Sequence, residues 1–246
     1  MQQSNGYIIG FAAALTIVLG GLLSLAAVGL KEKQREAVAL ETKKQILSAV
    51  MPTEGTEKQE LAKVYDQRIK SVVVNYDGEI VETDAEGNAV VPENVSIAKE
   101  YKKPKEDRHY PVFMFTSEND PEKVDAYILP VYGFGLWDYI WGYVALDGNF
   151  NTIAGVTFDH KGETPGLGAR ITDAEVQQRF QGKELYDNGG EFVSVKMLKG
   201  ETSSNLGPHT VNGLSGATIT ANGVSEMIYQ YMQNYNAYME KSKKAS

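Results

Sequence analysis

The first 30 residues carry no charged side chain, and this run constrains the chain more than any other feature of its sequence. As an α-helix rising about 1.5 Å per residue, the apolar segment 6–30 would span about 37 Å, whereas the hydrocarbon core of a bilayer is about 30 Å thick. A buried core helix rarely stays uncharged for so long. A signal peptide has a positively charged start and a shorter apolar stretch, and neither is found here. We therefore predict an uncleaved transmembrane anchor over residues 1–30.

The charges that follow this segment bear on its orientation. Lys31, Lys33 and Arg35 come directly after it, and no basic side chain precedes it. The positive-inside rule would then place the rest of the chain in the cytoplasm. The signal is weak, because only three basic residues contribute and they alternate with Glu32 and Glu36.

The remainder of the chain predicts an α+β fold. Residues 31–60 are expected to form a helical stalk or linker, and residues 61–246 a single domain with a mostly antiparallel sheet and flanking helices. Apolar and aromatic runs of the kind found in strands occur at 111–116, 126–133 and 142–160. A further strand is expected at 192–198, a short helix begins at a T-x-x-E capping box (Thr172 to Glu175), and a last helix runs from about 221 to 241.

Several classes of site are excluded or disfavoured by composition. The chain has no cysteine, so it has no disulfide, no thiolate-held metal or cluster and no cysteine nucleophile. Its formal net charge is -8 and no stretch is dominated by Lys or Arg, so we expect no nucleic-acid partner. There is no P-loop motif, and the three histidines share no metal-ligand spacing. We predict neither a catalytic residue nor a metal site.

Three glycine-rich segments stand out, at 129–142, 161–170 and 211–224. An ordered glycine is entropically costly unless the backbone needs a positive φ or a close approach. The segments can be separate tight turns, or they can together form one site whose backbone N–H groups face a ligand.

The tetrapeptide Ser215-Gly216-Ala217-Thr218 resembles the flavinylation motif of a group of membrane redox proteins, in which FMN is joined through its phosphate to the threonine. The segments LPVYGFGLW, GETPGLG and NGLSGATITANGV follow in the same order as in the C-subunit family of the sodium-translocating NADH:ubiquinone reductases, which this chain resembles over most of its length. The anchor running into AAVGLKEKQ fits the same family. The G subunit of the Rnf complex shares the anchor and the threonine motif, and remains an alternative.

This resemblance implies a covalent FMN on Thr218. A phosphodiester there would lie just before the last helix, whose N-terminus favours an anion. Ser215 and Thr220 would donate hydrogen bonds to the phosphate, although Thr220 and Asn222 could equally be ordinary N-caps, and Trp137 an ordinary core aromatic. The cofactor-binding residues implied are Trp137, Glu163, Thr164, Gly166, Leu167, Gly168, Ser215, Gly216, Ala217, Thr218 and Thr220.

Within this family, a carboxylate at Glu163 would face the flavin ring, and Gly166 and Gly168 would let the backbone approach that ring. Where the flavin transferase usually meets an aspartate, six residues before the threonine, this chain has Asn212.

The implied function is electron transfer within a sodium-pumping NADH:quinone oxidoreductase of the bacterial inner membrane. The chain would be enzymatic only as a subunit of that translocase. Its partners would be the other subunits, which supply electrons from an iron–sulfur centre and accept them on a second covalent FMN, and the flavin transferase that matures it. The resemblance places the FMN domain in the periplasm, against the positive-inside count.

Two further interpretations remain open at this point. The chain could be an anchored module that holds a ligand noncovalently, or an assembly protein of such a complex without a flavin.

Overall fold

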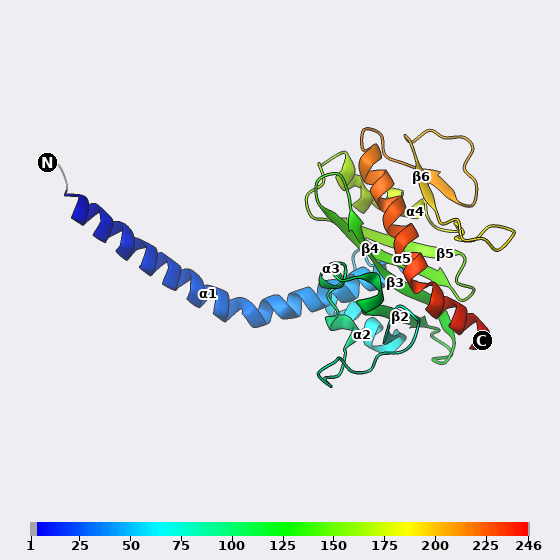
Figure 1. The fold of residues 1–246 in the computed structure, drawn as a ribbon, viewed down its shortest axis with the longest axis horizontal. Helices are drawn as coiled ribbons and strands as arrows, with labels where there is room; N and C mark the ends of the chain where they lie inside the picture. The colour runs from blue at the N-terminus through cyan, green and yellow to red at the C-terminus, as the bar shows by residue number, and fades with distance from the viewer. Residues whose placement is uncertain (1–3, 246) are drawn as a thin grey trace. The chain divides into compact units, whose positions relative to one another are not determined.

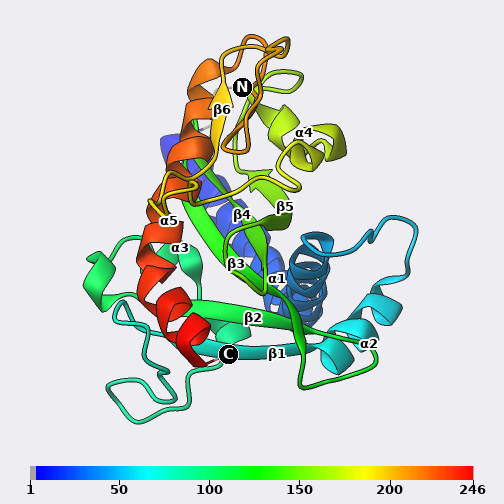
Figure 2. The same ribbon diagram turned by 90° about the vertical axis from the view of Figure 1, so that its right-hand side faces the viewer.

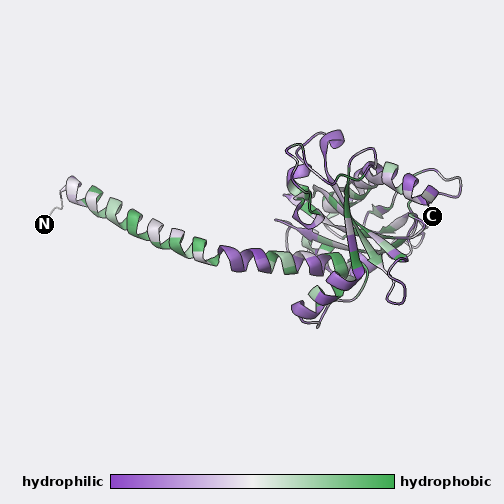
Figure 3. Ribbon diagram, turned by 90° about the horizontal axis from the view of Figure 1, so that it is seen from below, coloured by the Kyte–Doolittle hydropathy of each residue, from purple (hydrophilic) through white to green (hydrophobic). Residues whose placement is uncertain are grey.

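The computed structural model describes residues 4–245, and the chain divides into two compact units, Met1–Glu41 and Thr42–Ser246. Helix α1 (Asn5–Ser48) is long enough and apolar enough over its first part to cross a membrane. Figure 3 shows this apolar part of α1 and the polar part that follows it. The helix therefore continues without a break from the predicted anchor into the predicted stalk, and it ends before Pro52, which disfavours helical backbone at the residue before it.

The second unit is built on a five-stranded antiparallel sheet with the strand order β1-β2-β3-β4-β5. Its strands are β1 (Ile69–Val74), β2 (Tyr110–Thr116), β3 (Val124–Phe134), β4 (Tyr139–Asp147) and β5 (Ile153–His160). The α+β class and the antiparallel sheet predicted from the sequence are confirmed. β3 and β4 pair from Ala126 opposite Asp147 to Phe134 opposite Tyr139, so the turn between them lies at the same end of the sheet as His160, where β5 ends.

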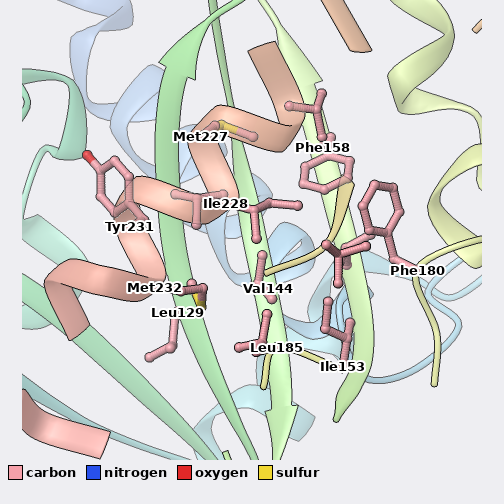
Figure 4. Packing of buried hydrophobic residues seen from close by; sticks show 14 of the residues in the cluster. Leu129, Val144, Ile153, Phe158, Phe180, Leu185, Met227, Ile228, Tyr231 and Met232 are labelled. Atoms are coloured by element: carbon pink, nitrogen blue, oxygen red, sulfur yellow. The ribbon is translucent and has the colours of Figure 1, made fainter. Parts of the chain in front are cut away.

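Helix α5 (Thr218–Ala245) lies across one face of this sheet (Figures 1 and 2). One side of the helix is apolar and buried, and Figure 4 shows Ile228 and Met232 of this side near Leu129 and Val144 of the sheet. The buried residues of this side are Val224, Met227, Ile228, Tyr231, Met232 and Tyr235. Each such side chain contributes about 1.5–3 kcal/mol when it leaves water. The helix begins at Thr218, three residues before the predicted start, because Ala217 already accepts the first helical hydrogen bond, from the N–H of Ala221 at 3.0 Å.

The opposite face of the sheet has its own buried cluster. Ile46 and Leu47, at the end of α1, and Leu61 of α2 (Lys58–Arg68) pack with Phe113 and Ile128. Successive residues of a strand point to opposite faces, so β2 and β3 supply side chains to both clusters.

The remaining elements are short. They are the 3-10 helices η1 (Pro92–Asn94), η2 (Lys105–Asp107) and η3 (Gly168–Thr172), the helices α3 (Ile97–Glu100) and α4 (Ala174–Gln178), and the parallel pair β6 (Lys196–Leu198) and β7 (Thr210–Asn212).

Two local predictions are wrong. The N-cap of α4 is Asp173 rather than Thr172, and the Thr172 hydroxyl donates instead to the Ala169 carbonyl at 3.0 Å. The strand expected at 192–198 is confined to β6, because Ser194 has a φ of 60° and its N–H turns aside to the Leu185 carbonyl.

Candidate functional site

The three glycine-rich segments meet at one end of the sheet, around the side chain of Glu163. Glu163 Oε1 accepts hydrogen bonds from the N–H groups of Leu136 at 2.8 Å and Trp137 at 3.0 Å, both in the turn between β3 and β4. Glu163 Oε2 accepts one from the hydroxyl of Thr220, in the first turn of α5, at 2.6 Å. We call this set of contacts the Glu163 junction. It makes the three segments parts of one structure rather than separate turns.

The Glu163 carboxylate is directed into the protein, with only 4% of the residue exposed. Burial raises the pKa of Glu163, but the hydrogen bonds from the Thr220 hydroxyl and from the N–H groups of Trp137 and Leu136 outweigh it and hold the pKa below its ordinary value. Glu163 is therefore an ionised carboxylate at neutral pH, with both oxygens engaged by internal donors. The sequence-based expectation had this carboxylate facing a ligand instead.

Two glycines at this end of the sheet make room for that carboxylate. A Cβ at Gly135 would collide with Glu163 Oε1, and a Cβ at Gly168 would collide with Glu163 Oε2 and lie 2.6 Å from the Thr220 hydroxyl. Position 168 must therefore be glycine because the Glu163 carboxylate and the Thr220 hydroxyl occupy the space that a Cβ would need. The sequence-based prediction gave another reason, a close approach of the backbone to a flavin ring. Gly166, with a φ of 74° and open space around it, is required by its left-handed backbone.

The two candidate threonines differ in accessibility. Thr218 is the first residue of α5 and is half-buried, behind the exposed Ser215 and Gly216 and the buried Ala217. Thr220 is fully buried, and its single hydroxyl proton is directed to Glu163. In this structure the Thr220 hydroxyl therefore donates to a carboxylate, whereas the sequence predicted donation to a phosphate.

Exposed apolar side chains gather on the same three segments. Trp137 is 64% exposed, so it is not the core aromatic that the sequence left as an alternative, and its indole N–H donates to the hydroxyl of Thr164 at 3.1 Å. Leu167 is 41% exposed and lies close to Gly216, since a Cβ on that glycine would be 3.0 Å from Leu167 Cδ2. Clustered exposed apolar residues are typical of ligand or partner sites. The full set is Phe134, Leu136, Trp137, Leu167 and Ile219.

An ionic network supports the loop before α5. Glu201 pairs with Arg170 and accepts the N–H of Ser215 at 2.9 Å, while Arg179 donates to the Gly213 carbonyl at 2.6 Å. The Arg170 guanidinium and the Ser215 N–H hold the pKa of Glu201 below its usual range. Sequence reasoning missed these residues because charged side chains so far apart in the chain give no local pattern.

Asn212 has a defined role in the same region. Its side-chain oxygen accepts the N–H of Ser203 at 3.0 Å, which ties the loop after β6 to β7. This contact needs only an acceptor oxygen, which asparagine and aspartate both supply.

Comparisons with known proteins agree with this arrangement. Residues 135–233, which contain the Glu163 junction and Thr218, match the family model of the FMN-binding domain. The C subunit of the Na(+)-translocating NADH-quinone reductase of Pseudomonas aeruginosa is 30% identical, over 99% of this chain and 98% of that protein. The C subunit from Yersinia pestis is 33% identical over 91% of this chain and 86% of that protein.

Solved structures give the same result. The crystal structure of the C subunit from Parabacteroides distasonis superposes with a TM-score of 0.72 and 34% identity, covering 85% of this chain and 96% of that one. Shewanella oneidensis NqrC gives a TM-score of 0.70 and 28% identity, covering 84% of this chain and 97% of that one. The resemblance found in the sequence is confirmed. The chain belongs to the C-subunit family of the Na(+)-translocating NADH-quinone reductases.

Proposed function

We propose that this chain is an electron-transfer subunit of a sodium-translocating NADH-quinone reductase, and that it carries FMN joined by a phosphoester to Thr218. The observation that carries the proposal is the position of Thr218, the half-buried first residue of α5, just after the exposed Ser215 and Gly216 in the sequence Ser215-Gly216-Ala217-Thr218.

The residues around Thr218 fit a phosphodiester. The first N–H groups of a helix have no intrahelical acceptor, and the positive end of the helix dipole favours an anion. Gly216 and Ala217 leave little side-chain bulk between solvent and the Thr218 hydroxyl. The exposed Ser215 hydroxyl is available as a further donor to phosphate oxygens.

The exposed apolar surface next to Thr218 fits the ring system of the flavin. Trp137 and Leu167 present apolar area on two of the three segments, and Thr164 holds the Trp137 indole. FMN supplies the redox chemistry when bound, and the protein supplies position and environment. Gly166 gives this segment the backbone turn that places Leu167 beside Gly216.

The chain would act within a membrane complex. Residues 1–30 would serve as the membrane anchor, residues 31–60 as the stalk and residues 61–246 as the FMN-binding domain, on the periplasmic side of a bacterial inner membrane. The other subunits would deliver and accept the electrons and couple the reaction to sodium transport, and a flavin transferase would attach FMN. The name shared by the relatives supports this assignment.

Fluorescence of the denatured chain tests the attachment. The full chain is produced together with a flavin transferase, denatured and separated by electrophoresis. We expect a fluorescent band from the wild type, its loss in Thr218→Val, and its retention in Thr202→Val, a matched change of an exposed threonine outside the motif. A yellow folded protein whose flavin is lost on denaturation would identify a noncovalent binding module and contradict the proposal.

A further inference from the structure

We propose that Glu163 is a positioning residue, which fixes the Trp137 turn and the start of α5 relative to each other and so sets how a flavin on Thr218 lies against the domain. The inference deepens the proposed function and, for its flavin part, rests on it. In this view Glu163 does not contact the flavin itself but acts on it by holding the two other segments in place.

The connectivity of the junction is the first argument. Glu163 reaches one segment 27 residues before it in the chain and another 57 residues after it, through Leu136 and Thr220 respectively. Thr220 is in the same helical turn as Thr218, so a shift of Thr220 moves the attachment point as well. One side chain thus fixes the separation between the turn that carries Trp137 and the residue proposed to carry the flavin.

The way Trp137 is held is the second argument. The ring of Trp137 is largely exposed. Its backbone N–H nevertheless donates to the Glu163 carboxylate, and its indole N–H donates to the hydroxyl of Thr164, the residue that follows Glu163 in the chain. An exposed aromatic side chain that is fixed at both ends by one dipeptide is preorganised, and preorganisation lowers the entropic cost of binding. The carboxylate is therefore part of what holds a ligand-facing ring in place.

The space around the carboxylate is the third argument. Gly135 and Gly168 face its two oxygens from two of the segments, and neither position has room for a Cβ. The three segments are consequently shaped around this one side chain. A buried charge with hydrogen bonds on both oxygens is also costly to disturb, because loss of any donor leaves part of the charge uncompensated.

A direct electrostatic action of the charge on the flavin is the competing explanation, and two substitutions separate it from positioning. Glu163→Gln removes the charge but keeps an oxygen for the N–H groups of Leu136 and Trp137 and a polar group for Thr220. Thr220→Val keeps the charge and removes the link to α5. Positioning predicts that Thr220→Val has the larger effect, and direct electrostatics predicts the opposite.

The first experiment uses the full chain in detergent, incubated with a flavin transferase. We expect Glu163→Leu and Thr220→Val to slow covalent incorporation of FMN by about tenfold or more, since displacements of about 1 Å can cost up to about a hundredfold in rate. Both should also change the absorption spectrum of the attached flavin in the same way. Glu163→Gln and Thr220→Ser should stay close to the wild type in rate, spectrum and reduction potential.

The control is Glu93→Leu, which removes a carboxylate that accepts hydrogen bonds from Tyr65 at 2.7 Å and Ser71 at 2.9 Å, outside the three segments. It should leave the rate and the spectrum unchanged. The proposal is overturned if Glu93→Leu has the effect of Glu163→Leu. It is also overturned if Glu163→Gln alone shifts the potential while Thr220→Val behaves as wild type, because the charge would then act directly.

A second measurement needs no flavin and separates this inference from the proposed function. In a Trp141→Phe background, Trp137 is the one tryptophan of the chain. Its fluorescence anisotropy should fall in Glu163→Leu and be restored in Glu163→Gln. If the anisotropy falls in Glu163→Leu but the wild type shows no covalent flavin in the electrophoresis test, attachment at Thr218 is refuted and the positioning of Trp137 is supported. If the anisotropy is unchanged in Glu163→Leu, the positioning role itself is overturned.

Discussion

Gly168 shows how a single residue depends on a segment that is distant in sequence. A Cβ at this position would collide with Glu163 Oε2 and crowd the Thr220 hydroxyl. Overpacking of a tight site typically costs about 1–3 kcal/mol. We therefore expect Gly168→Ala to lower the free energy of unfolding by about that amount, measured by urea denaturation of the full chain in detergent. Gly162→Ala in the same segment is the control, because its Cβ would meet Asp138 at an ordinary 3.6 Å, and an equal loss there would contradict the explanation.

The lowered pKa of Glu163 gives a second prediction at this scale. Hydrogen bonding holds the pKa below its ordinary value of 4.5, so the folded state binds a proton less readily than the unfolded state. The resulting stability is present above pH 4.5 and is lost as the pH falls through the lower native pKa. Stability measured at pH 6 and at progressively lower pH should therefore fall less steeply in Glu163→Gln than in wild type. Parallel curves would show that this carboxylate does not contribute.

The Glu163 junction also marks what the sequence could not predict about the site. The three glycine-rich segments were recognisable as candidates, because glycine there is costly without a structural or functional reason. Their convergence on one carboxylate depends on hydrogen bonds between Glu163 and residues on two other segments, which no local pattern encodes. The attachment of FMN to Thr218 stays a prediction.

At the scale of elements, apolar and aromatic runs were informative where burial is regular. They predicted the strands β2 to β5 and the last helix α5, and these elements are confirmed. Prediction was wrong where a single local hydrogen bond went elsewhere. At the start of α4 it is the bond from the Thr172 hydroxyl, and before β6 it is the bond from the N–H of Ser194, which has a positive φ. Local energies there differ by about 1 kcal/mol, which is small enough for tertiary contacts to reverse.

The loop that leads into α5 supplies the prediction at this scale. Glu201 accepts the Ser215 N–H and pairs with Arg170, so Glu201→Ala removes a charged acceptor from both the Ser215 N–H and the Arg170 guanidinium. We expect a loss of about 1–3 kcal/mol in stability and faster amide hydrogen exchange at Ser215. Glu175→Ala is the matched control, because Glu175 is 78% exposed and its pair with Arg179 should contribute at most about 0.5 kcal/mol. Unchanged exchange at Ser215 in Glu201→Ala would show that the ionic network does not fix this loop.

At the scale of the whole molecule, the sequence indicates the membrane segment clearly but its orientation ambiguously. The length and apolarity of the first part of α1 suit a bilayer. Lys31, Lys33 and Arg35 favour a cytoplasmic domain, whereas the proposed function has the domain in the periplasm. Three basic residues interleaved with two glutamates give only a small bias toward a cytoplasmic domain. Neighbouring subunits of a membrane complex can override this bias when they fix the topology.

The absence of cysteine makes this conflict directly testable. Single cysteines can be placed at two exposed positions, Ser4 before the apolar run and Ser204 in the domain, and labelled in intact cells with a thiol reagent that does not cross the inner membrane. With a periplasmic domain, Ser204→Cys should be labelled in intact cells and Ser4→Cys only after lysis, because thiol reactivity requires access to the reagent. The wild type, which has no thiol, gives the background. The reverse pattern would place the domain in the cytoplasm, in agreement with the basic residues after the anchor, and would contradict the proposed topology.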